Sequence, residues 1–159
     1  LTFNQVYMFS EPRILKPLPR LQGWFDDEHY LMQKRDATTS AIVKVNAKTG
    51  EETVVLDYNA INPNLDDAEL TAEENIAITK DYTGLLFYDD NDLFFYSVLQ
   101  KKVIRLTNDK DEEVNPMLSP DGKRVAFTRK KDLFVVDVES AKENRLTNDA
   151  SDVFYNGYA

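Results

Sequence analysis

Histidine is the first residue type to test for chemistry, because it is the usual general base of hydrolytic enzymes. The chain has one histidine, His29, in an acidic turn that leads into an expected strand. A Ser-His-Asp triad also needs an activated serine, and no serine here stands in a Gly-x-Ser-x-Gly elbow. Cysteine is absent, which excludes thiolate catalysis and zinc–thiolate sites. The sequence therefore predicts no catalytic residue, and we interpret His29 as a histidine at the surface or at the edge of a blade.

Two acidic segments could in principle bind a cation: Asp89-Asp90-Asn91-Asp92 and residues 108–113. A calcium-binding EF-hand loop needs glycine at its sixth position and glutamate at its twelfth. Counted from Asp89, those positions hold Phe94 and Gln100. No pair of carboxylates is singled out for glycoside hydrolysis either. We therefore expect solvated turns, with no metal site and no cofactor.

Charge and hydropathy narrow the classes of partner. The 28 acidic residues outnumber the 19 basic ones, giving a net charge of −9. A negative field repels phosphate backbones, so nucleic acid is not expected as a partner. The longest apolar stretches, such as Leu85-Leu86-Phe87-Tyr88, have the length of a strand. They are too short for a membrane span, which takes about 20 residues.

An internal repeat is the most informative feature of the chain. Residues 93–109 read LFFYSVLQKKVIRLTND, and residues 133–149 read LFVVDVESAKENRLTND. The two copies lie about 40 residues apart and share their last five residues. We expect the leucine of this ending to pack between repeats and Thr-Asn-Asp to form a turn. A fainter copy runs from residues 42–45 through a turn at Gly50 to residues 54–56.

The elements that make up the repeat are expected to be strands, because apolar and β-branched residues alternate along short runs. Turn residues separate these runs, as in Ser119-Pro120-Asp121-Gly122 and Lys48-Thr49-Gly50-Glu51. A short helix is expected at the start of the chain, an irregular segment over 12–19, and an inserted loop or one short helix over 62–75. The expected strands are 29–34, 41–46, 52–57, 76–79, 84–89, 92–98, 102–107, 114–119, 123–130, 132–138, 143–147 and 152–155.

A strand-only repeat of about 40 residues indicates a β-propeller, in which each repeat is a four-stranded antiparallel blade. A single blade cannot bury its two apolar faces, whereas stacked blades cover one another. The fold class predicted is therefore all-β, a partial propeller of about three to four blades, since rings usually close with about four to eight. The predicted division is an irregular N-terminal segment at 1–22, blade-like repeats at 23–60, 76–109 and 114–149, and the start of a further blade at 150–159.

The order of these motifs resembles the N-terminal propeller of the dipeptidyl peptidase IV family, serine peptidases of the prolyl oligopeptidase clan. Three segments carry the resemblance. They are LKPLPRLQGWFDDEHYL at 15–31, NPMLSPDGKRVAF at 115–127, and SDVFYNGYA at 151–159. The last is similar to the approach to the family's glutamate motif, in which a Trp-Val-Tyr-Glu-Glu run follows an Asn-Gly turn.

The resemblance implies a function for the whole protein. In this family the propeller filters and positions peptides, and a separate C-terminal α/β-hydrolase domain carries the Ser-Asp-His triad. The family's glutamates bind the free amine of the substrate, which explains removal of N-terminal dipeptides. The triad is not in this chain, so the chain alone is expected to be inactive. The resemblance also implies a homodimer, because peptidases of this family often dimerise. A periplasmic or secreted location is expected as well, and the start at Leu1 suggests processing or trimming.

One departure from the family and one alternative bear on this prediction. The family uses a propeller arginine to contact the substrate, in an extended stretch before the equivalent of Leu93. Here that stretch is the short turn Asp89-Asp90-Asn91-Asp92, without an arginine. The alternative function is a non-enzymatic propeller scaffold for protein–protein interaction in the cell envelope, because the Ser-Pro-Asp-Gly turn is shared with such propellers.

Overall fold

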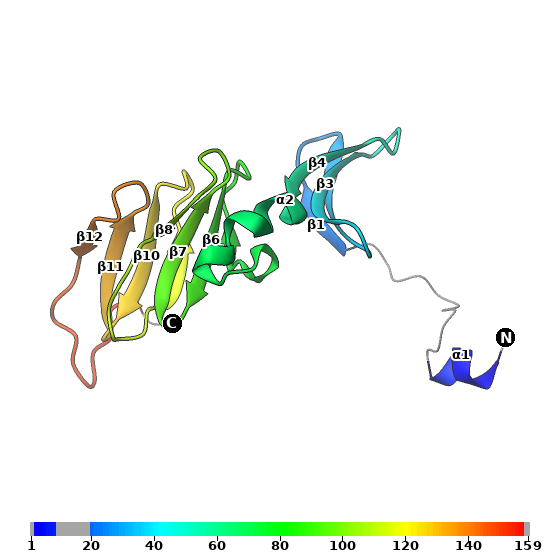
Figure 1. Ribbon diagram of the computed structural model, residues 1–159. Helices are drawn as coiled ribbons and strands as arrows, with labels where there is room; N and C mark the ends of the chain where they lie inside the picture. Colours follow the sequence, from blue (N-terminus) through cyan, green and yellow to red (C-terminus); the bar gives the residue numbers. More distant parts are fainter. Residues whose placement is uncertain (1, 9–19, 158–159) are drawn as a thin grey trace. The chain divides into compact units, whose positions relative to one another are not determined.

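The computed structural model describes residues 2–8 and 20–157 (Figure 1). The irregular segment predicted at 12–19 lies outside these residues. The expected short helix at the start of the chain is α1 (Phe3–Tyr7), where the rings of Phe3 and Tyr7 lie 4.7 Å apart. The chain divides into two compact units, Leu1–Leu56 and Asp57–Ala159, which are described separately.

The predicted all-β class is confirmed, because the described strands form three four-stranded antiparallel sheets of a partial propeller. In each sheet, strands that follow one another in sequence are neighbours, as in a propeller blade. The part of the chain that the structure describes holds no helix long and apolar enough to cross a membrane.

The first sheet has the order β1-β2-β3-β4. Its strands are β1 (Arg20–Trp24), β2 (His29–Arg35), β3 (Ser40–Asn46) and β4 (Glu52–Asp57). Strand β1 was not predicted, and the expectation of an irregular chain up to residue 22 is wrong from Arg20 onward. Its sequence, Arg-Leu-Gln-Gly-Trp, has no β-branched residue and is exposed throughout. The segment is therefore a strand because it pairs with β2, and not because of its own strand propensity. The pairing includes a bulge between Leu21 and Gly23.

Short helical turns occupy the segment that was predicted as an inserted loop or one helix. They are α2 (Tyr58–Ile61) and the 3₁₀ turns Asn62–Asn64, Asp66–Ala68 and Ala72–Glu74. The Asp57 carboxylate caps α2 by accepting from the backbone N–H of Ala60 at 3.3 Å. The Asn62 side chain accepts from the backbone N–H of Ala72 at 2.7 Å. The two ends of the insert are thereby joined to each other.

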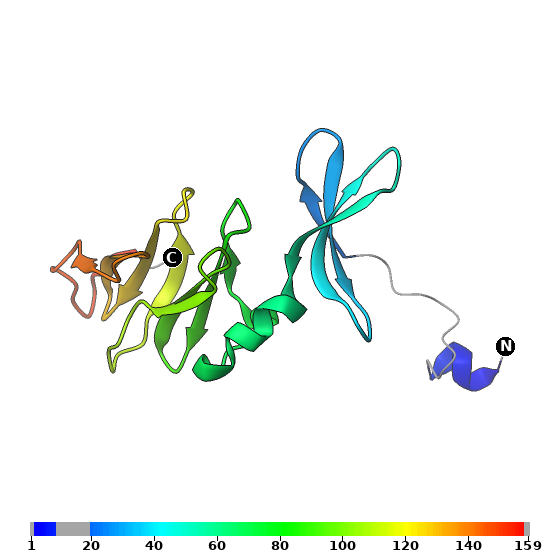
Figure 2. The same ribbon diagram turned by 45° about the horizontal axis from the view of Figure 1, so that its top comes forward.

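The second and third sheets both lie in the unit Asp57–Ala159 and follow the internal repeat (Figure 2). The second sheet consists of β5 (Ala77–Ile78), β6 (Gly84–Asp89), β7 (Asp92–Ser97) and β8 (Lys102–Arg105). The third consists of β9 (Val114–Leu118), β10 (Arg124–Arg129), β11 (Asp132–Asp137) and β12 (Glu143–Arg145).

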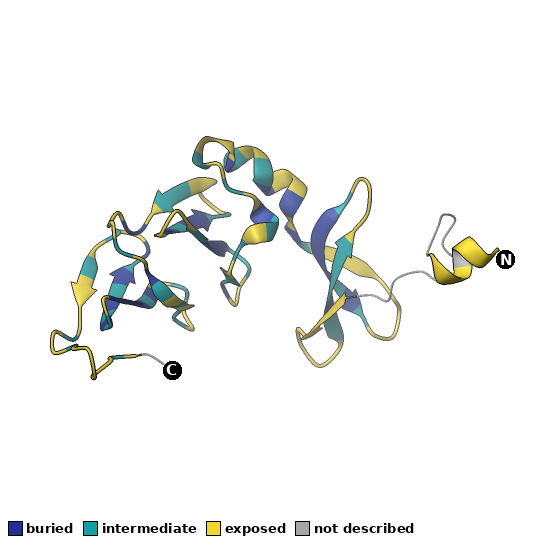
Figure 3. Cartoon of the chain, turned by 90° about the horizontal axis from the view of Figure 1, so that it is seen from below, coloured by how far each residue is buried: buried dark blue, intermediate teal, exposed yellow. Residues whose placement is uncertain are grey.

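The apolar core of this unit lies between the two sheets, and Figure 3 shows buried residues along their central strands. Alternating positions of β10 and β11 face the second sheet, so Phe127 and Phe134 stack with ring centroids 5.6 Å apart. The buried members of the cluster are Leu86, Leu93, Phe95, Leu106, Val125, Phe127, Phe134, Val136 and Val138. The expected burial of one blade against the next is thus seen in this unit.

The same turn leads into the second strand of both repeats. The Ser119 hydroxyl donates to the Asp121 carboxylate at 2.6 Å and accepts from the backbone N–H of Arg124 at 3.0 Å. In the second sheet the Thr79 hydroxyl donates to Asp81 at 2.7 Å and accepts from the N–H of Gly84 at 2.9 Å. The turn predicted from Ser-Pro-Asp-Gly is therefore confirmed, and its less obvious copy uses threonine in place of serine.

The strand predicted at 152–155 is wrong. Residues 152–157 contain bends and irregular backbone, with a turn in which the N–H of Ser151 donates to the carbonyl of Phe154 at 2.9 Å. Val-Phe-Tyr has high strand propensity, but among the described residues no strand pairs with it.

Candidate functional site

A repeated network of hydrogen bonds closes the second and third sheets at one end. In the second sheet it is centred on Asp92, the buried first residue of β7. Its carboxylate pairs with the Arg105 guanidinium and accepts from the Thr107 hydroxyl at 3.3 Å and the Asp109 N–H at 3.2 Å. The Thr107 hydroxyl in turn accepts from the N–H of Leu93 at 2.8 Å. The first copy of the Arg-Leu-Thr-Asn-Asp ending thus ties the last strand to the third.

The third sheet contains the second copy, centred on Asp132, the first residue of β11. Its carboxylate pairs with Arg145 and accepts from the Thr147 hydroxyl at 2.9 Å and the Ala150 N–H at 3.3 Å. The Thr147 hydroxyl accepts from the N–H of Leu133 at 2.9 Å. In both copies Thr-Asn-Asp has irregular backbone and forms no turn, so the predicted turn is wrong, and the threonine instead bonds the start of the third strand.

The leucines of the two endings differ. Leu106 belongs to the core cluster between the sheets, as predicted for packing between repeats. Leu146 is 57% exposed, so the same prediction is not met by the described residues at the second copy.

Arg129, at the end of β10, is the centre of a second charged cluster. Its guanidinium donates to the Glu113 carboxylate at 3.1 Å and to Glu143, and lies 3.7 Å from Asp109 Oδ2. It also lies over the Phe134 ring, 4.5 Å from the centroid. Burial acts against the charge on Arg129, but Glu143 and Glu113 outweigh it and raise its pKa. Arg129 therefore stays cationic and joins the linker before β9 to the third sheet.

Glu113 is the most deeply buried member of this cluster. Its side chain is fully buried, and its Oε2 atom has no hydrogen-bond partner among the described residues. Burial raises the pKa of Glu113, and the ion pair with Arg129 only partly opposes this.

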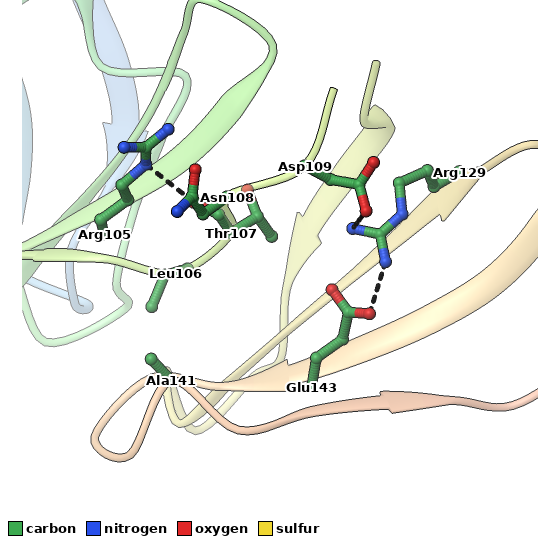
Figure 4. Close-up of a pocket in the computed structure, with 8 residues that line it drawn as sticks. All are labelled: Arg105, Leu106, Thr107, Asn108, Asp109, Arg129, Ala141 and Glu143. Atoms are coloured by element: carbon green, nitrogen blue, oxygen red, sulfur yellow. Dashed lines mark hydrogen bonds and ion pairs between the residues drawn. The ribbon is translucent and has the colours of Figure 1, made fainter. Parts of the chain in front are cut away.

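A polar pocket of about 500 Å³ lies beside Arg129 (Figure 4). It is lined by Arg105, Leu106, Thr107, Asn108, Asp109, Arg129, Ala141 and Glu143. In Figure 4 the Arg129 guanidinium lies between the carboxylates of Asp109 and Glu143. These groups already pair with one another, and the lining includes no nucleophile with an adjacent base. We interpret the pocket as part of a structural ion-pair network.

Residues 150–157, here called the exit arm, follow the third sheet and contact the β10–β11 turn. The Asn156 side chain donates to Asp132 Oδ1 at 3.1 Å and to Asp149 Oδ1 at 2.9 Å. The Asn156 N–H donates to the carbonyl of Lys131 at 2.8 Å. Lys131 also pairs with Asp152 at 3.1 Å. The exit arm is therefore fixed to the start of β11 by side-chain and backbone bonds.

These contacts also affect the ionisation of the groups at the turn. Burial acts to raise the pKa of Asp132, but the hydrogen bonds from Arg145, Thr147 and Asn156 outweigh it and hold the pKa below its usual value. The bond with Asp152 raises the pKa of Lys131. Both groups are therefore charged at neutral pH, and the turn presents a fixed carboxylate and a fixed ammonium to the exit arm.

His29 lies in the first unit, where both of its ring nitrogens are used. Nδ1 donates to Asp26 Oδ1 at 2.7 Å, and Nε2 accepts from the Asn46 side chain at 3.3 Å. Asp26 also accepts from the backbone N–H of Glu28, which is the main reason that its pKa is lowered. The arrangement fixes the turn between β1 and β2.

Of the two acidic segments singled out in the sequence, one forms a hairpin turn and the other forms a linker between two sheets. Asp90 and Asn91 form the two-residue turn between β6 and β7, with φ of 45° and 67°, while Asp92 belongs to the buried network. Residues 108–113 form the linker that Arg129 holds. Within the described ranges no three histidine, cysteine, aspartate or glutamate side chains converge as metal ligands. The prediction that the chain holds no metal stays a prediction.

Sequence reasoning missed the partners that define this region. Asp132, Asn156 and Arg129 were not singled out, although the repeated ending and the Asn-Gly pair were. Asp132 and Asn156 are 24 residues apart, so no local pattern brings them together. The usable signal was that one aspartate begins the same strand in both repeats.

Comparison with known proteins finds one family model that is similar to this region. Residues 89–159 match the model of the dipeptidyl peptidase IV (DPP IV) N-terminal region. Dipeptidyl peptidase 4 from Porphyromonas gingivalis has a similar structure, with a TM-score of 0.50 and 20% identity over 82% of this chain and 19% of that chain. A protein from Bacteroides ovatus assigned as dipeptidyl aminopeptidase IV matches with a TM-score of 0.50 and 19% identity, over 84% of this chain and 18% of that one.

The remaining comparisons add little. TolB from Acinetobacter baumannii matches with 19% identity over 85% of this chain and 33% of that chain, but its TM-score of 0.42 is too low to support the scaffold alternative. No curated protein sequence matches the chain. The structural likenesses show the propeller fold, and the chain spans about a fifth of the two peptidase structures. The resemblance to the dipeptidyl peptidase IV family is confirmed over residues 89–159, which match the family's N-terminal region.

Proposed function

We propose that the chain is part of the N-terminal propeller of a dipeptidyl peptidase IV-like serine peptidase. In this role it filters and positions peptides whose N-terminal dipeptides are removed by a separate α/β-hydrolase domain. The observation that carries the proposal is the family match over residues 89–159, which includes the third sheet and the exit arm. We place the protein in the periplasm or outside the cell, where peptides are its substrates. The homodimer expected for this family stays a prediction.

The exit arm supports this role through its position in the chain. Asn156 and Gly157 form the Asn-Gly pair that, in the resemblance, precedes the family's glutamate motif. Two desolvated carboxylates are suited to bind one ammonium group, because each can accept a charge-assisted hydrogen bond. In the full-length protein the third sheet would then position the residues that recognise the amine of the substrate.

The turn between β6 and β7 indicates how this protein would differ from its relatives. Both central residues, Asp90 and Asn91, have positive φ, which is typical of a tight type I′ hairpin. The hairpin therefore has no extended stretch and no arginine for substrate contact. We expect recognition to depend on the amine more than on the backbone of the second substrate residue.

The test is hydrolysis of a chromogenic Gly-Pro amide by the full-length protein, with its N-acetylated form as the matched substrate. We expect turnover of the free-amine substrate, sensitivity to a serine-directed fluorophosphonate, and at least about 100-fold slower turnover of the acetylated form, because a lost charged contact costs several kcal/mol. The 159-residue chain alone is the negative control. Absence of turnover by the full-length protein, or equal turnover of both substrates, would contradict the proposal. In the first case the scaffold alternative would be favoured.

A further inference from the structure

We propose that Asp132 is a positioning residue that fixes the path of the exit arm through Asn156. The positioning follows from the contacts of this chain alone. Its expected effect on substrate binding rests on the proposed function.

Comparison of the two repeats shows that this contact is an addition to the shared network. Asp92 and Asp132 each accept from the arginine and threonine of their own repeat and from one backbone N–H. Among the described residues, Asp132 but not Asp92 also accepts from a side chain further along the chain, that of Asn156. In the earlier repeat the residues 41 and 40 positions before Asn156 are Asn115 and Pro116, and within the described structure neither donates a side-chain hydrogen bond to Asp92. Closing the sheet therefore does not require the bond to Asn156.

Side-chain hydrogen bonds hold the exit arm within the described residues. After the first network, residues 114–118 form β9 and pair with β10. After the second network, residues 152–155 form no strand in the structure. The side-chain amide of Asn156 donates hydrogen bonds to the carboxylates of Asp132 and Asp149. Its backbone N–H donates to the carbonyl of Lys131.

The neighbouring contacts fix the direction as well as the position of the exit arm. The Lys131 ammonium bonds Asp152 and lies 4.7 Å from the centroid of the Tyr155 ring. Gly157 has φ of 69°, and a Cβ at this position would lie 3.1 Å from the Thr128 methyl group. The chain therefore leaves Asn156 lying against β10, in a conformation that favours glycine.

The consequence for function concerns binding geometry. Misplacement of a binding group by about 1 Å can lower catalytic efficiency by up to about 100-fold. Under the proposed function, release of the exit arm displaces the residues that bind the amine of the substrate, which follow it in the chain. The loss is expected in KM more than in kcat, because these residues are remote from the bond that is cleaved.

The experiment uses Asn156→Ala and the size-matched Asn156→Asp in the full-length protein. Both leave the Asp132–Arg145–Thr147 network intact, and Asn156→Asp places a third carboxylate beside Asp132 and Asp149. The first readout is backbone hydrogen exchange at the N–H of Asn156, which we expect to become at least about tenfold faster in Asn156→Ala and faster still in Asn156→Asp. Exchange within β11 should not change.

The second readout is the kinetics of the free-amine dipeptidyl substrate. We expect KM to rise about tenfold in Asn156→Ala and further in Asn156→Asp, with kcat changed less than about threefold. Asp132→Ala should reproduce the exchange effect on the exit arm. The matched control Asp92→Ala, which breaks the equivalent network of the second sheet, should leave the exit arm protected.

Each outcome decides a separate point. Unchanged exchange at Asn156 in both Asn156 variants would overturn the positioning role, whether or not the protein is active. Faster exchange with unchanged KM would overturn the link to substrate binding. Absence of activity in the unmodified full-length protein would contradict the proposed function, and the exchange data would still decide whether Asp132 positions the exit arm.

Discussion

At the scale of single residues, the Glu113–Arg129 pair determines how the linker before β9 is held. The side chain of Glu113 is fully buried and that of Arg129 is 10% exposed. Transfer of such charges out of water costs several kcal/mol per ion, so each depends on the other to remain buried. Glu143 and Asp109 lie nearer the solvent and can turn outward. The cost of breaking the cluster should therefore appear mainly at Glu113.

The first prediction separates the two partners. Arg129→Met keeps most of the side-chain volume but leaves the Glu113 carboxylate buried without a cation, and we expect a loss of about 3–5 kcal/mol in the free energy of unfolding. The double variant Arg129→Met/Glu113→Met removes both charges and should recover at least about 2 kcal/mol of that loss. Urea unfolding followed by far-ultraviolet circular dichroism measures both. A double variant less stable than Arg129→Met would show that Glu113 is not the residue left uncompensated.

The second prediction concerns pH and the same carboxylate. Burial raises the pKa of Glu113 above its usual 4.5, so the folded protein holds this proton more tightly than the unfolded chain. Glu113 therefore contributes stability that is fully present below about pH 4.5 and is lost as pH rises through its folded pKa. Measured against Glu113→Gln, the original protein should gain relative stability as pH falls from about 7 towards about 4.5. Carboxylates with lowered pKa, such as Asp132, are common to both proteins and cancel. A difference that is constant or that shrinks over this range would contradict the prediction.

At the scale of elements, the equivalent hairpins of the two repeats have different residue types in their turns. Asp90 and Asn91 occupy the turn between β6 and β7, and Lys130 and Lys131 occupy the turn between β10 and β11. All four have positive φ, and the two lysines have φ of 51° and 70°. A type I′ turn favours asparagine and glycine at both central positions, so the lysines carry strain that the second sheet avoids.

The third prediction follows from this comparison. Lys130→Asn should raise the free energy of unfolding by about 0.5–1 kcal/mol, because asparagine adopts positive φ more readily. The ion pair of Lys130 with Asp111 is on the surface, with the lysine side chain 72% exposed, and contributes little. Lys131→Asn is the matched variant and should gain less, because it loses the contacts with Asp152 and the Tyr155 ring. Urea unfolding of the two variants checks the order, and a larger gain in Lys131→Asn would contradict it.

The elements also show how far sequence reasoning reaches. Alternating apolar residues and turn residues predicted eleven of the described strands to within a few residues, because burial and turn geometry are local in sequence. Strand β1 was missed because partner pairing holds it, and the strand at 152–155 was wrong because nothing described pairs with it. The candidate site was largely missed, since contacts such as that of Asn156 with Asp132 join residues far apart in the chain.

At the scale of the whole molecule, the two units differ in the amount of apolar core that each contains. The unit Asp57–Ala159 has two sheets with a shared apolar cluster. The unit Leu1–Leu56 has one sheet, with a small buried cluster of Ala41, Val43 and Val45. A sheet must bury its apolar face against another layer, and the sheet of this unit extends only from Arg20 to Asp57, near the size of about 40 residues below which folds usually need a disulfide or metal as well. The chain has no cysteine with which to form a disulfide.

The last prediction is that these units differ in independent stability. Residues 57–159, expressed alone, should fold cooperatively and retain slow hydrogen exchange at the N–H groups of Phe127 and Val136, because the cluster between its two sheets is complete without residues 1–56. Residues 1–56 alone should show a narrow, unfolded range of amide proton shifts, and the intact chain serves as the reference for both. Cooperative folding of residues 1–56 would show that one blade supplies enough burial by itself. Loss of protection at Phe127 in residues 57–159 would show that the cluster between the two sheets does not sustain folding, which would contradict mutual burial as the physical reason that blades stack.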